Sequence, residues 1–542
     1  MFLPLLVLLA LAEGYRRTRH RIAAVRPRLA PAWRELRADW ANALRGVAWW
    51  EWASLAAATA LALALRLRDL HQPIRYDEAA TWLDYASKPL LAGLSDYRFP
   101  NNHLFHTLLV HVSAALFGDS PAALRIPALV AGVLLIPLTW GVARAYHSPA
   151  AATLAATLAA TSASLVLYST NARGYTIVCC LTMAIALLAA RQRTRDNVAG
   201  WLAIALLAAL GAWTIPIMLY PLLGIALWLW AEARAGDALL DARTMRARLG
   251  WTGAVTAACC AILYMPVIAR SGIGLVVGNR FVRPQSRSSF FAALPNFYAL
   301  LWEDWTRGWP VWLALVVAAG ALVALFARHA GKPRIPLFGA ALAAATTLLV
   351  VNGRVPYLRV WLFLLPLLIV AAGGGLAWLG ARALAALGIA RDSTIARATL
   401  LVGAGALGIA GATSLVRSDV VRRADDTGTL RDGAAIAALL ARDVGPRDRV
   451  IATAPTDVPL AYHLQRLHLA HDLLRATPDS APRLWVVVND ADGQRLPELL
   501  DAAQVMTIDF AAPRLVARLP EARVFALDRV QPGCGLDRSR CR

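Results

Sequence analysis

Residues 103–118, HLFHTLLVHVSAALFG, decide how the chain threads through a membrane. The stretch is apolar, but it is short for a crossing, which takes about 20 residues. His103, Thr107 and His111 fall on one helical stripe, and the opposite face carries leucine, valine and alanine. A helix with two such faces lies along the membrane surface, so we expect 103–118 to be an interfacial helix.

The composition of the whole chain places it in a membrane. Its 542 residues are 58% hydrophobic and 16% charged, and the mean hydropathy is +0.52. A soluble protein of this length would need far more polar surface. The net charge of +21 comes largely from arginine in short loops between apolar runs, a pattern that sets orientation and attracts anionic lipid head groups. No recognition module accompanies this charge, so we expect membrane lipids as partners and no nucleic acid.

The apolar runs predict a polytopic α-helical membrane protein with about 11–12 transmembrane helices, extracytoplasmic interfacial helices and a small C-terminal α/β domain. Residues 1–13 form a short apolar run, and whether they span the membrane stays open. The predicted spans are 47–66, 122–145, 149–168, 174–190, 198–213, 215–232, 249–269, 309–327, 335–351, 358–380 and 397–416.

The charge in the loops indicates which loops are cytoplasmic and which are extracytoplasmic. With 103–118 left out of the membrane, the loops that carry Arg191, Arg234, Arg328 and Arg382 all fall on one side. Counting that stretch as a crossing would push every later basic loop outside, against the positive-inside bias. The side without these loops is therefore extracytoplasmic. It contains residues 67–121, 169–173, 270–308, 352–357 and everything after 416.

Changes in composition and hydrophobic pattern along the sequence suggest three domains. Residues 1–46 are an apolar and basic segment, cytoplasmic or interfacial, and residues 47–416 hold the spans. Residues 417–542 alternate short strand-like runs (DRVIATAP, PRLWVVVND, QVMTIDF, ARVFALD) with helix-like stretches, so we expect an extracytoplasmic α/β domain. Its tail contains Cys534 and Cys541 in CGLDRSRC, for which an oxidising compartment predicts a disulfide.

An acidic and aromatic patch, IRYDEAATWLDY (74–85), follows the first span on the predicted extracytoplasmic face. Asp77 and Glu78 are adjacent carboxylates beside Tyr76. A carboxylate that aromatic neighbours desolvate at a membrane surface is suited to act as a general base. Alternatively, Asp77 caps the following helix and Glu78 favours its dipole. The residues alone leave both interpretations open.

Other candidate binding residues gather on the same face, at the mouths of later spans. Arginine binds phosphate through its planar fork, although an arginine at a membrane boundary also snorkels towards water. Both interpretations stay open for each arginine. The candidates, besides Tyr76 and Glu78, are Asn101, Asn102, His103, His106, Asn171, Arg173, Tyr175, Arg354, Tyr357 and Arg359.

The evidence for a metal is weak. His103 and His106 have a spacing at which both imidazoles could reach one ion, but no third ligand is evident. We therefore predict no metal site, the cofactor stays unknown, and dependence on a divalent metal stays open. Glu303 and Asp304, in LLWEDWTRGWP, are better explained as solvated loop acids than as a catalytic pair.

Four motifs in order resemble a known family. YDEAATW, NNHLFHTLLVHVSAALFGDSPAALRIPALVAG, YSTNARGYTIVCCL and PYLRVWLFLLPLL are similar to motifs of the C-superfamily of integral-membrane glycosyltransferases. The likeness covers about residues 47–380 and is closest to the branch of protein mannosyltransferases, aminoarabinose transferases and related bacterial enzymes. One departure is that Asn101 and Asn102 stand where aminoarabinose transferases have an acidic–basic pair. Another is NARGY, which replaces a stretch that contains an aspartate in those enzymes.

The resemblance implies an enzyme of the inner (plasma) membrane whose active site faces the extracytoplasmic side. The donor would be a polyprenyl-phosphate sugar, and the acceptor a hydroxyl on a lipid, glycan or protein. Asp77 matches the position of the family's general base, and direct displacement would invert the anomeric configuration. The loops at Asn171–Tyr175 and at Arg354–Arg359 would line the pocket for the lipid phosphate and the sugar.

The rival function is transport or flipping of a polar lipid. A transporter favours internal repeats and broken helices with ionisable residues near the membrane midplane. The predicted spans are nearly free of charge, and the polar residues cluster in loops on one face. This pattern favours an enzyme.

The topology can be tested with fused reporters. A reporter after Arg195 is expected to be cytoplasmic and one after Asp426 extracytoplasmic, because only an interfacial 103–118 puts the basic loops on one side. Alkaline phosphatase and fluorescent-protein activities measure the two locations. Finding both reporters on the same side would contradict the predicted topology.

Overall fold

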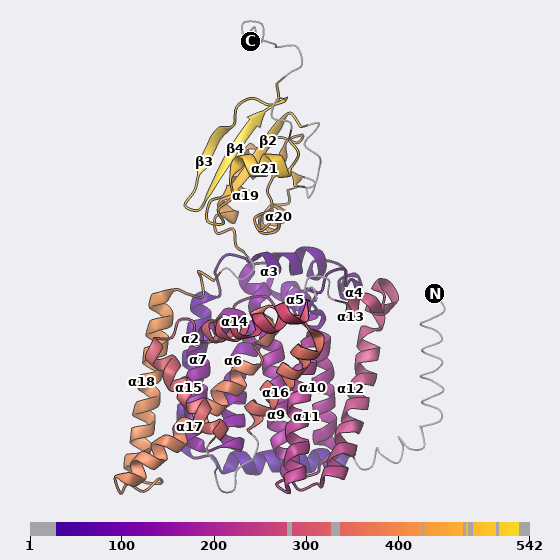
Figure 1. Cartoon of the computed structure of the whole chain (residues 1–542). Coiled ribbons are helices and arrows are strands. Elements are labelled where there is room, and N and C mark those ends of the chain that lie inside the picture. Colours follow the sequence, from indigo (N-terminus) through magenta and orange to yellow (C-terminus); the bar gives the residue numbers. More distant parts are fainter. Residues whose placement is uncertain are drawn as a thin grey trace. The chain divides into compact units, whose positions relative to one another are not determined.

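The computed structural model describes residues 29–278, 285–326, 336–424, 428–469, 473–474, 481–505 and 509–530 (Figure 1). The chain is mostly helical with a small sheet near the C-terminus, which confirms the predicted fold class. It divides into two compact units. The first is Met1–Leu70, Leu90–Ser113 and Leu124–Arg423, and the second is His71–Pro89, Ala114–Ala123 and Ala424–Arg542. Cys534 and Cys541 lie outside the described residues, so their disulfide stays a prediction.

The first helix among the described residues is Leu29–Arg45, which meets α2 at a bend of 97°. The further elements are α2 (Trp49–Asp69), α4 (Leu90–Ser95), α5 (Leu104–Phe117), α6 (Pro121–Tyr146), α7 (Pro149–Thr161), α8 (Ala163–Ser169), α9 (Tyr175–Thr194), α10 (Val198–Thr214), η2 (Pro216–Met218), α11 (Leu219–Ala235), α12 (Ala242–Ser271), α13 (Ile273–Val277), α14 (Arg287–Thr306), α15 (Val311–Phe326), α16 (Leu337–Asn352), η3 (Leu358–Trp361), α17 (Leu364–Ala386) and α18 (Thr394–Ser418).

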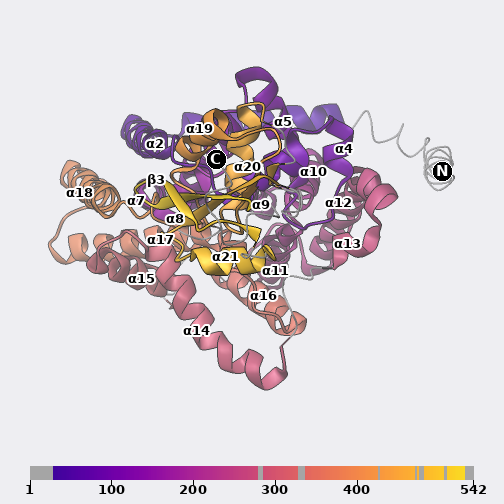
Figure 2. The ribbon, with the colours of Figure 1, turned by 90° about the horizontal axis from the view of Figure 1, so that it is seen from above.

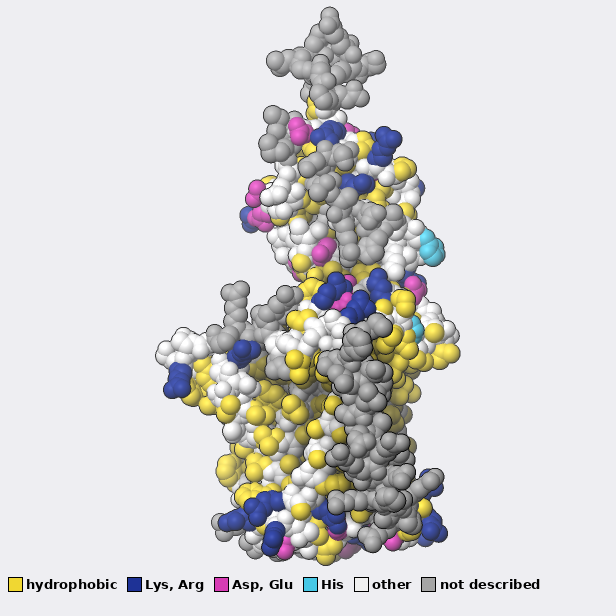
Figure 3. Space-filling model, turned by 90° about the vertical axis from the view of Figure 1, so that its right-hand side faces the viewer, with side chains coloured by type: hydrophobic (Ala, Val, Ile, Leu, Met, Phe, Trp, Pro, Cys, Tyr) yellow, Lys and Arg dark blue, Asp and Glu magenta, His cyan; other side chains and the backbone are white. Residues whose placement is uncertain are grey.

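By length and hydropathy, fewer helices qualify as spans than predicted. In the described ranges six helices are long and apolar enough to cross a membrane. The number rises to at most nine if each bent pair is counted as one span, whereas the sequence predicts 11–12 spans. The difference includes α10 and α16, which we counted as spans but which have only 17 and 16 residues. The pair of α14 and α15 bends by 115°, and α14 lies across the other helices (Figure 2). Seen from the side, a hydrophobic wall ends in a group of Lys and Arg side chains (Figure 3).

The helix in the deciding stretch, α5, has 14 residues, too few to cross a bilayer. Its polar side chains point into the protein, because His106 and Thr107 are buried. Val112 and Leu116 are exposed instead, at 46% and 70% of their surface. This exposed apolar face suits contact with lipid, so α5 keeps its predicted interfacial role.

A break between α7 and α8 directs the chain towards the polar loop at 170–174. The two helices meet at an angle of 61°, where Ser162 takes an extended conformation. A break frees carbonyl groups that the helix would otherwise satisfy. The Nη1 atom of buried Arg66 donates to Ala160 O (3.4 Å), and Trp309 Nε1 donates to Thr161 O (3.1 Å). These bonds stabilise a bend that we had predicted as one continuous span.

Small residues let the helices of the first unit pack closely. A Cβ atom on Gly375 of α17 would lie 1.9 Å from the carbonyl oxygen of Gly320 on α15. A Cβ atom on Gly224 of α11 would lie 2.6 Å from the Cα atom of Ala341 on α16. Backbones at this distance gain van der Waals contact where the hydrophobic effect gives no drive between helices.

The second unit contains a four-stranded sheet in the order β1-β2-β4-β3. β1 and β2 are parallel, and the other two pairs are antiparallel. Helices α19 and α20 cover one face, and α21 covers the other. The elements are α3 (Tyr76–Thr81), η1 (Trp82–Ala86), α19 (Gly433–Asp443), β1 (Arg449–Ile451), α20 (Asp457–Arg466), β2 (Arg483–Asn489), α21 (Leu496–Ala502), β3 (Arg514–Arg518) and β4 (Ala522–Asp528).

Two segments from early in the chain, His71–Pro89 and Ala114–Ala123, belong to the same unit as the C-terminal sheet. The acidic stretch packs its helix α3 against α20. Tyr76 N donates to Gly428 O (3.1 Å), and buried Arg75 donates to Ala424 O and, at 3.1 Å, to Gln72 Oε1. The acidic patch is therefore built into the same unit as the C-terminal α/β fold, an association that the predicted domain of 417–542 did not include.

Candidate active site

In the first unit, the loop after α8 is fixed to the residue that precedes α5. Gly174 N donates to His103 Nδ1 at 2.9 Å. The guanidinium of Arg173 donates through Nη1 to Asn101 O (2.8 Å), and its Nη2 lies 3.2 Å from His103 Nε2. His103 and Arg173 are 2% and 3% exposed, so two predicted site residues meet inside the protein.

Close approach of the loop requires glycine at position 174. A Cβ atom there would lie 2.6 Å from Thr214 Cγ2 and 3.2 Å from His103 Nδ1. Real Cβ atoms essentially never approach a neighbour to 2.6 Å, so any larger residue must shift the loop or the surrounding helices. The distance from Gly174 to His103 therefore sets the geometry of the site.

The hydrogen bond to the loop fixes the tautomer of His103. Because Nδ1 accepts the Gly174 N–H, the proton of the neutral ring is on Nε2. Burial, followed by the nearby charge of Arg173, holds the pKa of His103 well below its usual value, so the ring stays neutral. The Nε2 proton and the Arg173 guanidinium are then two donors that face each other. An anionic oxygen beside them would accept from both.

Tyr175 connects this pair to a second arginine. Its hydroxyl accepts a hydrogen bond from Arg359 Nε (3.1 Å), and its ring packs edge-on against His103 with the centroids 5.1 Å apart. The Arg173 guanidinium lies 5.9 Å from the centroid of the same ring. Arg359 also stacks over Tyr357, 4.5 Å from the centroid. Three of the predicted residues, His103, Arg173 and Arg359, thus surround one buried tyrosine, and two of them are cations, which favours an anionic ligand.

The two asparagines of NNH, both predicted to bind substrate, make hydrogen bonds within the fold. Asn102 is buried, and its Nδ2 donates to Gly93 O (2.9 Å) and Asp96 O (2.6 Å). Its Oδ1 accepts from Thr107 Oγ1 at 2.7 Å. The side chain of Asn102 is therefore occupied in holding the turn before α5, and Asn101 contributes its backbone carbonyl to Arg173.

Two buried polar groups near the site keep unused hydrogen-bonding capacity among the described residues. Asn171 is 1% exposed, and its Oδ1 has no hydrogen-bond partner there. His106 is fully buried with neither ring nitrogen bonded, and burial, then the charge of Arg173, lowers its pKa to about 3. Both groups could meet a substrate hydroxyl. Within the described ranges no cluster of three His, Cys, Asp or Glu residues could hold a metal ion.

Sequence reasoning missed Tyr97. It is 3% exposed, burial raises its pKa to about 12, and the charge of Arg173 opposes that shift. Tyr97 also lines a cavity of about 340 Å³ together with Arg98 and Arg354. Arg354 lines this cavity, whereas Arg359 of the same predicted loop contacts Tyr175. Only its aromatic character in DYRFPNNH distinguished Tyr97 in the sequence.

Asp77 and Glu78 belong to the second unit, where they differ sharply. Glu78 is 1% exposed, and its Oε2 accepts from the backbone N–H of Arg75 at 2.9 Å. Arg75, and not Asp77, is thus the N-cap residue of α3, with Glu78 completing the capping box. Asp77 is half-buried in the first turn.

Further carboxylates gather around Tyr76 in the second unit. Burial raises the pKa of Tyr76, and the charges of Asp457, Asp77 and Asp84 raise it further. Burial also raises the pKa of Asp457. Asp457 begins α20 and was not among the predicted site residues. The sequence held no signal that would bring it to Tyr76.

Comparisons with known proteins find one matching family model and several similar structures. The family model described as dolichyl-phosphate-mannose-protein mannosyltransferase matches residues 102–268. The structure of ArnT from Cupriavidus metallidurans in the apo state is similar, with a TM-score of 0.59 at 15% identity over 87% of this chain and 97% of that one. The structure of the same protein bound to undecaprenyl phosphate has a TM-score of 0.54 at 15% identity, over 88% of this chain and 98% of that one.

A third similar structure is the arabinofuranosyltransferase AftD from Mycobacteria, with a TM-score of 0.50 at 17% identity over 88% of this chain and 40% of that one. No curated protein matches the sequence. At these identities the structures show a shared fold. The resemblance drawn from the four sequence motifs is confirmed.

Substituting Gly174 tests the geometry of the site. Gly174→Ala is expected to cost about 1–3 kcal/mol, because the new methyl group overpacks against Thr214 and His103. Thermal unfolding of the purified protein in detergent measures the loss. Gly405→Ala on α18, where nothing lies within 4 Å, is the control and should leave the midpoint unchanged or raise it slightly, because alanine is a better helix former than glycine. Equal midpoints for both variants would contradict the close approach.

Proposed function

Taking this chain as a member of the C-superfamily of integral-membrane glycosyltransferases, we propose that it transfers a sugar from a polyprenyl phosphate to an acceptor hydroxyl. The observation that carries the proposal is the cluster of buried Arg173, His103 and Tyr175 with half-buried Arg359. A lipid phosphate is dianionic or monoanionic at neutral pH and needs several positioned donors when it leaves water. This cluster supplies two guanidinium groups and the Nε2–H of a neutral imidazole.

The cluster would act on the leaving group. As the bond from the anomeric carbon to the phosphate oxygen breaks, its electron pair stays on the phosphate, which gains negative charge. Donors fixed in a buried site stabilise that charge without reorganisation. Arg173 is held by Asn101 O, and Arg359 by Tyr175, so both guanidinium groups are oriented before the reaction.

Activation of the acceptor falls to Asp77. The acceptor oxygen forms its bond to the anomeric carbon while its proton passes to the Asp77 carboxylate, and this single displacement inverts the configuration. Glu78 is the weaker candidate because its carboxylate already completes the capping box of α3. Asp77 is half-buried in the first turn of α3, and its carboxylate does not complete the capping box.

The class of donor rests on the similar proteins. The related ArnT structure contains undecaprenyl phosphate, and the matched family model is named for a dolichyl-phosphate mannose donor. AftD is named for transfer of arabinofuranose, so both hexosyl and pentosyl transfer fit the family. We place the active site on the extracytoplasmic side of the inner (plasma) membrane, in keeping with the basic loops of the opposite side.

Removing the base tests the catalytic role of Asp77. Asp77→Asn keeps the shape of the side chain but removes its basicity, so turnover should fall by about 10²–10⁴-fold. Asp84→Asn is the matched control, because it removes a neighbouring carboxylate of the same cluster and should change turnover little. The measurement is sugar transfer from a polyprenyl-phosphate donor by protein in nanodiscs. Near-normal turnover of Asp77→Asn would rule out this base.

A second substitution tests the anion site. Arg173→Lys keeps the charge but loses the fork that contacts Asn101 O and His103, so kcat/KM for the donor should fall by about 10–100-fold. Arg248→Lys is the control, since Arg248 pairs with Asp196 and its side chain is 37% exposed. Donor titrations of both variants supply the comparison. Equal kcat/KM values would show that Arg173 does not contact the donor.

A further inference from the structure

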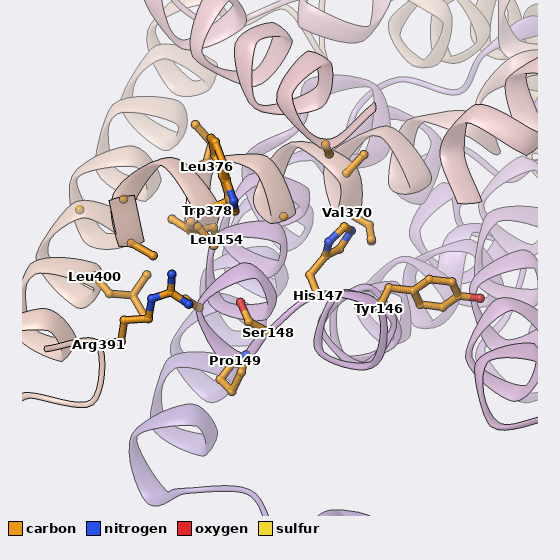
Figure 4. A pocket seen from close by; sticks show the side chains of 18 of the residues that line it. Tyr146, His147, Ser148, Pro149, Leu154, Val370, Leu376, Trp378, Arg391 and Leu400 are labelled. Atoms are coloured by element: carbon orange, nitrogen blue, oxygen red, sulfur yellow. The ribbon is translucent and has the colours of Figure 1, made fainter. Parts of the chain in front are cut away.

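A second and much larger cavity lies at the other end of α7 from the candidate active site. Its volume is about 1480 Å³, and its walls come from α7, α15, α16, α17 and α18 (Figure 4). The 13 residues of α7 rise by about 1.5 Å each, so α7 alone spans roughly 20 Å between the cavity and the break that leads to the candidate active site. Pockets for small ligands measure about 300–1,000 Å³. This cavity therefore fits a lipid better than a small polar molecule.

The cavity exists because α17 and α18 pack on α7 at different places. Gly411 of α18 lies against Thr161, with a would-be Cβ atom 2.6 Å from Thr161 Oγ1. Gly373 of α17 lies against α7 near its start, with a would-be Cβ atom 2.8 Å from Ala151 O. The first half of α18 therefore does not pack closely against α17. Small and aliphatic side chains, among them Leu154, Val370, Ala371, Leu400 and Gly403, line the space between them.

The end of the cavity near the start of α7 is polar and basic. Arg391 and Arg397 line it, and Asp392 is the one carboxylate among the lining residues that the structure describes. Arg397 Nη2 donates to the backbone oxygen of Asp392 at 2.8 Å. In Figure 4 the guanidinium group of Arg391 points towards Ser148, the N-cap residue of α7. The positive end of the α7 dipole adds to the same potential.

Aromatic residues mark this end as the level of a membrane interface. Trp50 and Trp378 line the cavity, and Arg382 stacks on Trp378 with 5.0 Å between the guanidinium carbon and the ring centroid. Tryptophan and arginine gather where the apolar part of a bilayer meets its head groups. A ligand here would place its charge beside Arg391 and its apolar part between the helices.

We propose that this cavity binds one anionic glycerophospholipid. Arg391 and Arg397 would hold its phosphate, and the acyl chains would fill the space between α17 and α18. The excess positive charge at the mouth complements the anionic head group of such a lipid, and the apolar interior complements its acyl chains. The bound lipid would fix the first half of α18, whose Ile395 and Val402 are 61% and 72% exposed in the protein alone.

A pair of glycines on α18 provides a matched test. Gly403 lines the cavity and Gly405 does not, and both have nothing within 4 Å of a would-be Cβ atom. Gly403→Phe should project a ring into the cavity, clash with the acyl chains and reduce retained phosphatidylglycerol by about tenfold, while Gly405→Phe should retain it as the wild type does. Native mass spectrometry of protein exchanged into a mixture of phosphatidylglycerol and phosphatidylcholine counts the retained lipids.

The charged mouth is tested separately. The double variant Arg391→Gln/Arg397→Gln should lose the preference for phosphatidylglycerol by about 10–100-fold, the range for a hydrogen bond to a charged group. Arg417→Gln, at the far end of α18 and outside the cavity, should keep it. The proposal is overturned if the wild type retains both lipids equally, if added polyprenyl phosphate displaces the phospholipid from the wild type, or if Gly403→Phe and Gly405→Phe retain equal amounts.

Discussion

The hydrogen bond from Gly174 N to His103 Nδ1 is the contact on which the site depends. It joins the loop that follows the α7–α8 break to the first residue before α5, and it fixes the histidine proton on Nε2. Arg173 can then reach Asn101 O and face that proton, and Tyr175 can extend the cluster to Arg359. Glycine makes the contact possible, because a side chain at position 174 would enter the space of Thr214.

Local pattern predicted α5 well, because a short apolar stretch with a polar stripe has few other solutions. It predicted less about the orientation of that helix, since the polar stripe faces the protein and the apolar face is exposed. The break at Ser162 was missed because neither Pro nor Gly marks it, and long-range bonds from Arg66 and Trp309 stabilise it. Such bonds leave no trace in a local window of sequence.

Some of the site residues could be predicted from the sequence, and others depend on contacts between distant parts of the chain. The types and order of residues were enough to single out His103, Arg173, Tyr175 and Arg359, which the structure brings together. Glu78 and Asn102 are polar residues whose hydrogen bonds are used within the fold, which a sequence cannot reveal. β3 was missed because its arginine ends and short length give a weak strand signal. The packing of α3 against α20, which places Asp457 near Tyr76, depends on contacts between distant parts of the chain.

The central claim is that the buried cluster recognises the phosphate of a polyprenyl lipid. The most direct measurement compares the affinity of the purified protein for undecaprenyl phosphate with its affinity for undecaprenol, which has the same chain and no phosphate. Two charge-assisted contacts predict that the phosphate lipid binds at least about 100-fold more tightly. Equal affinities would contradict the account, because the chain alone would then explain binding.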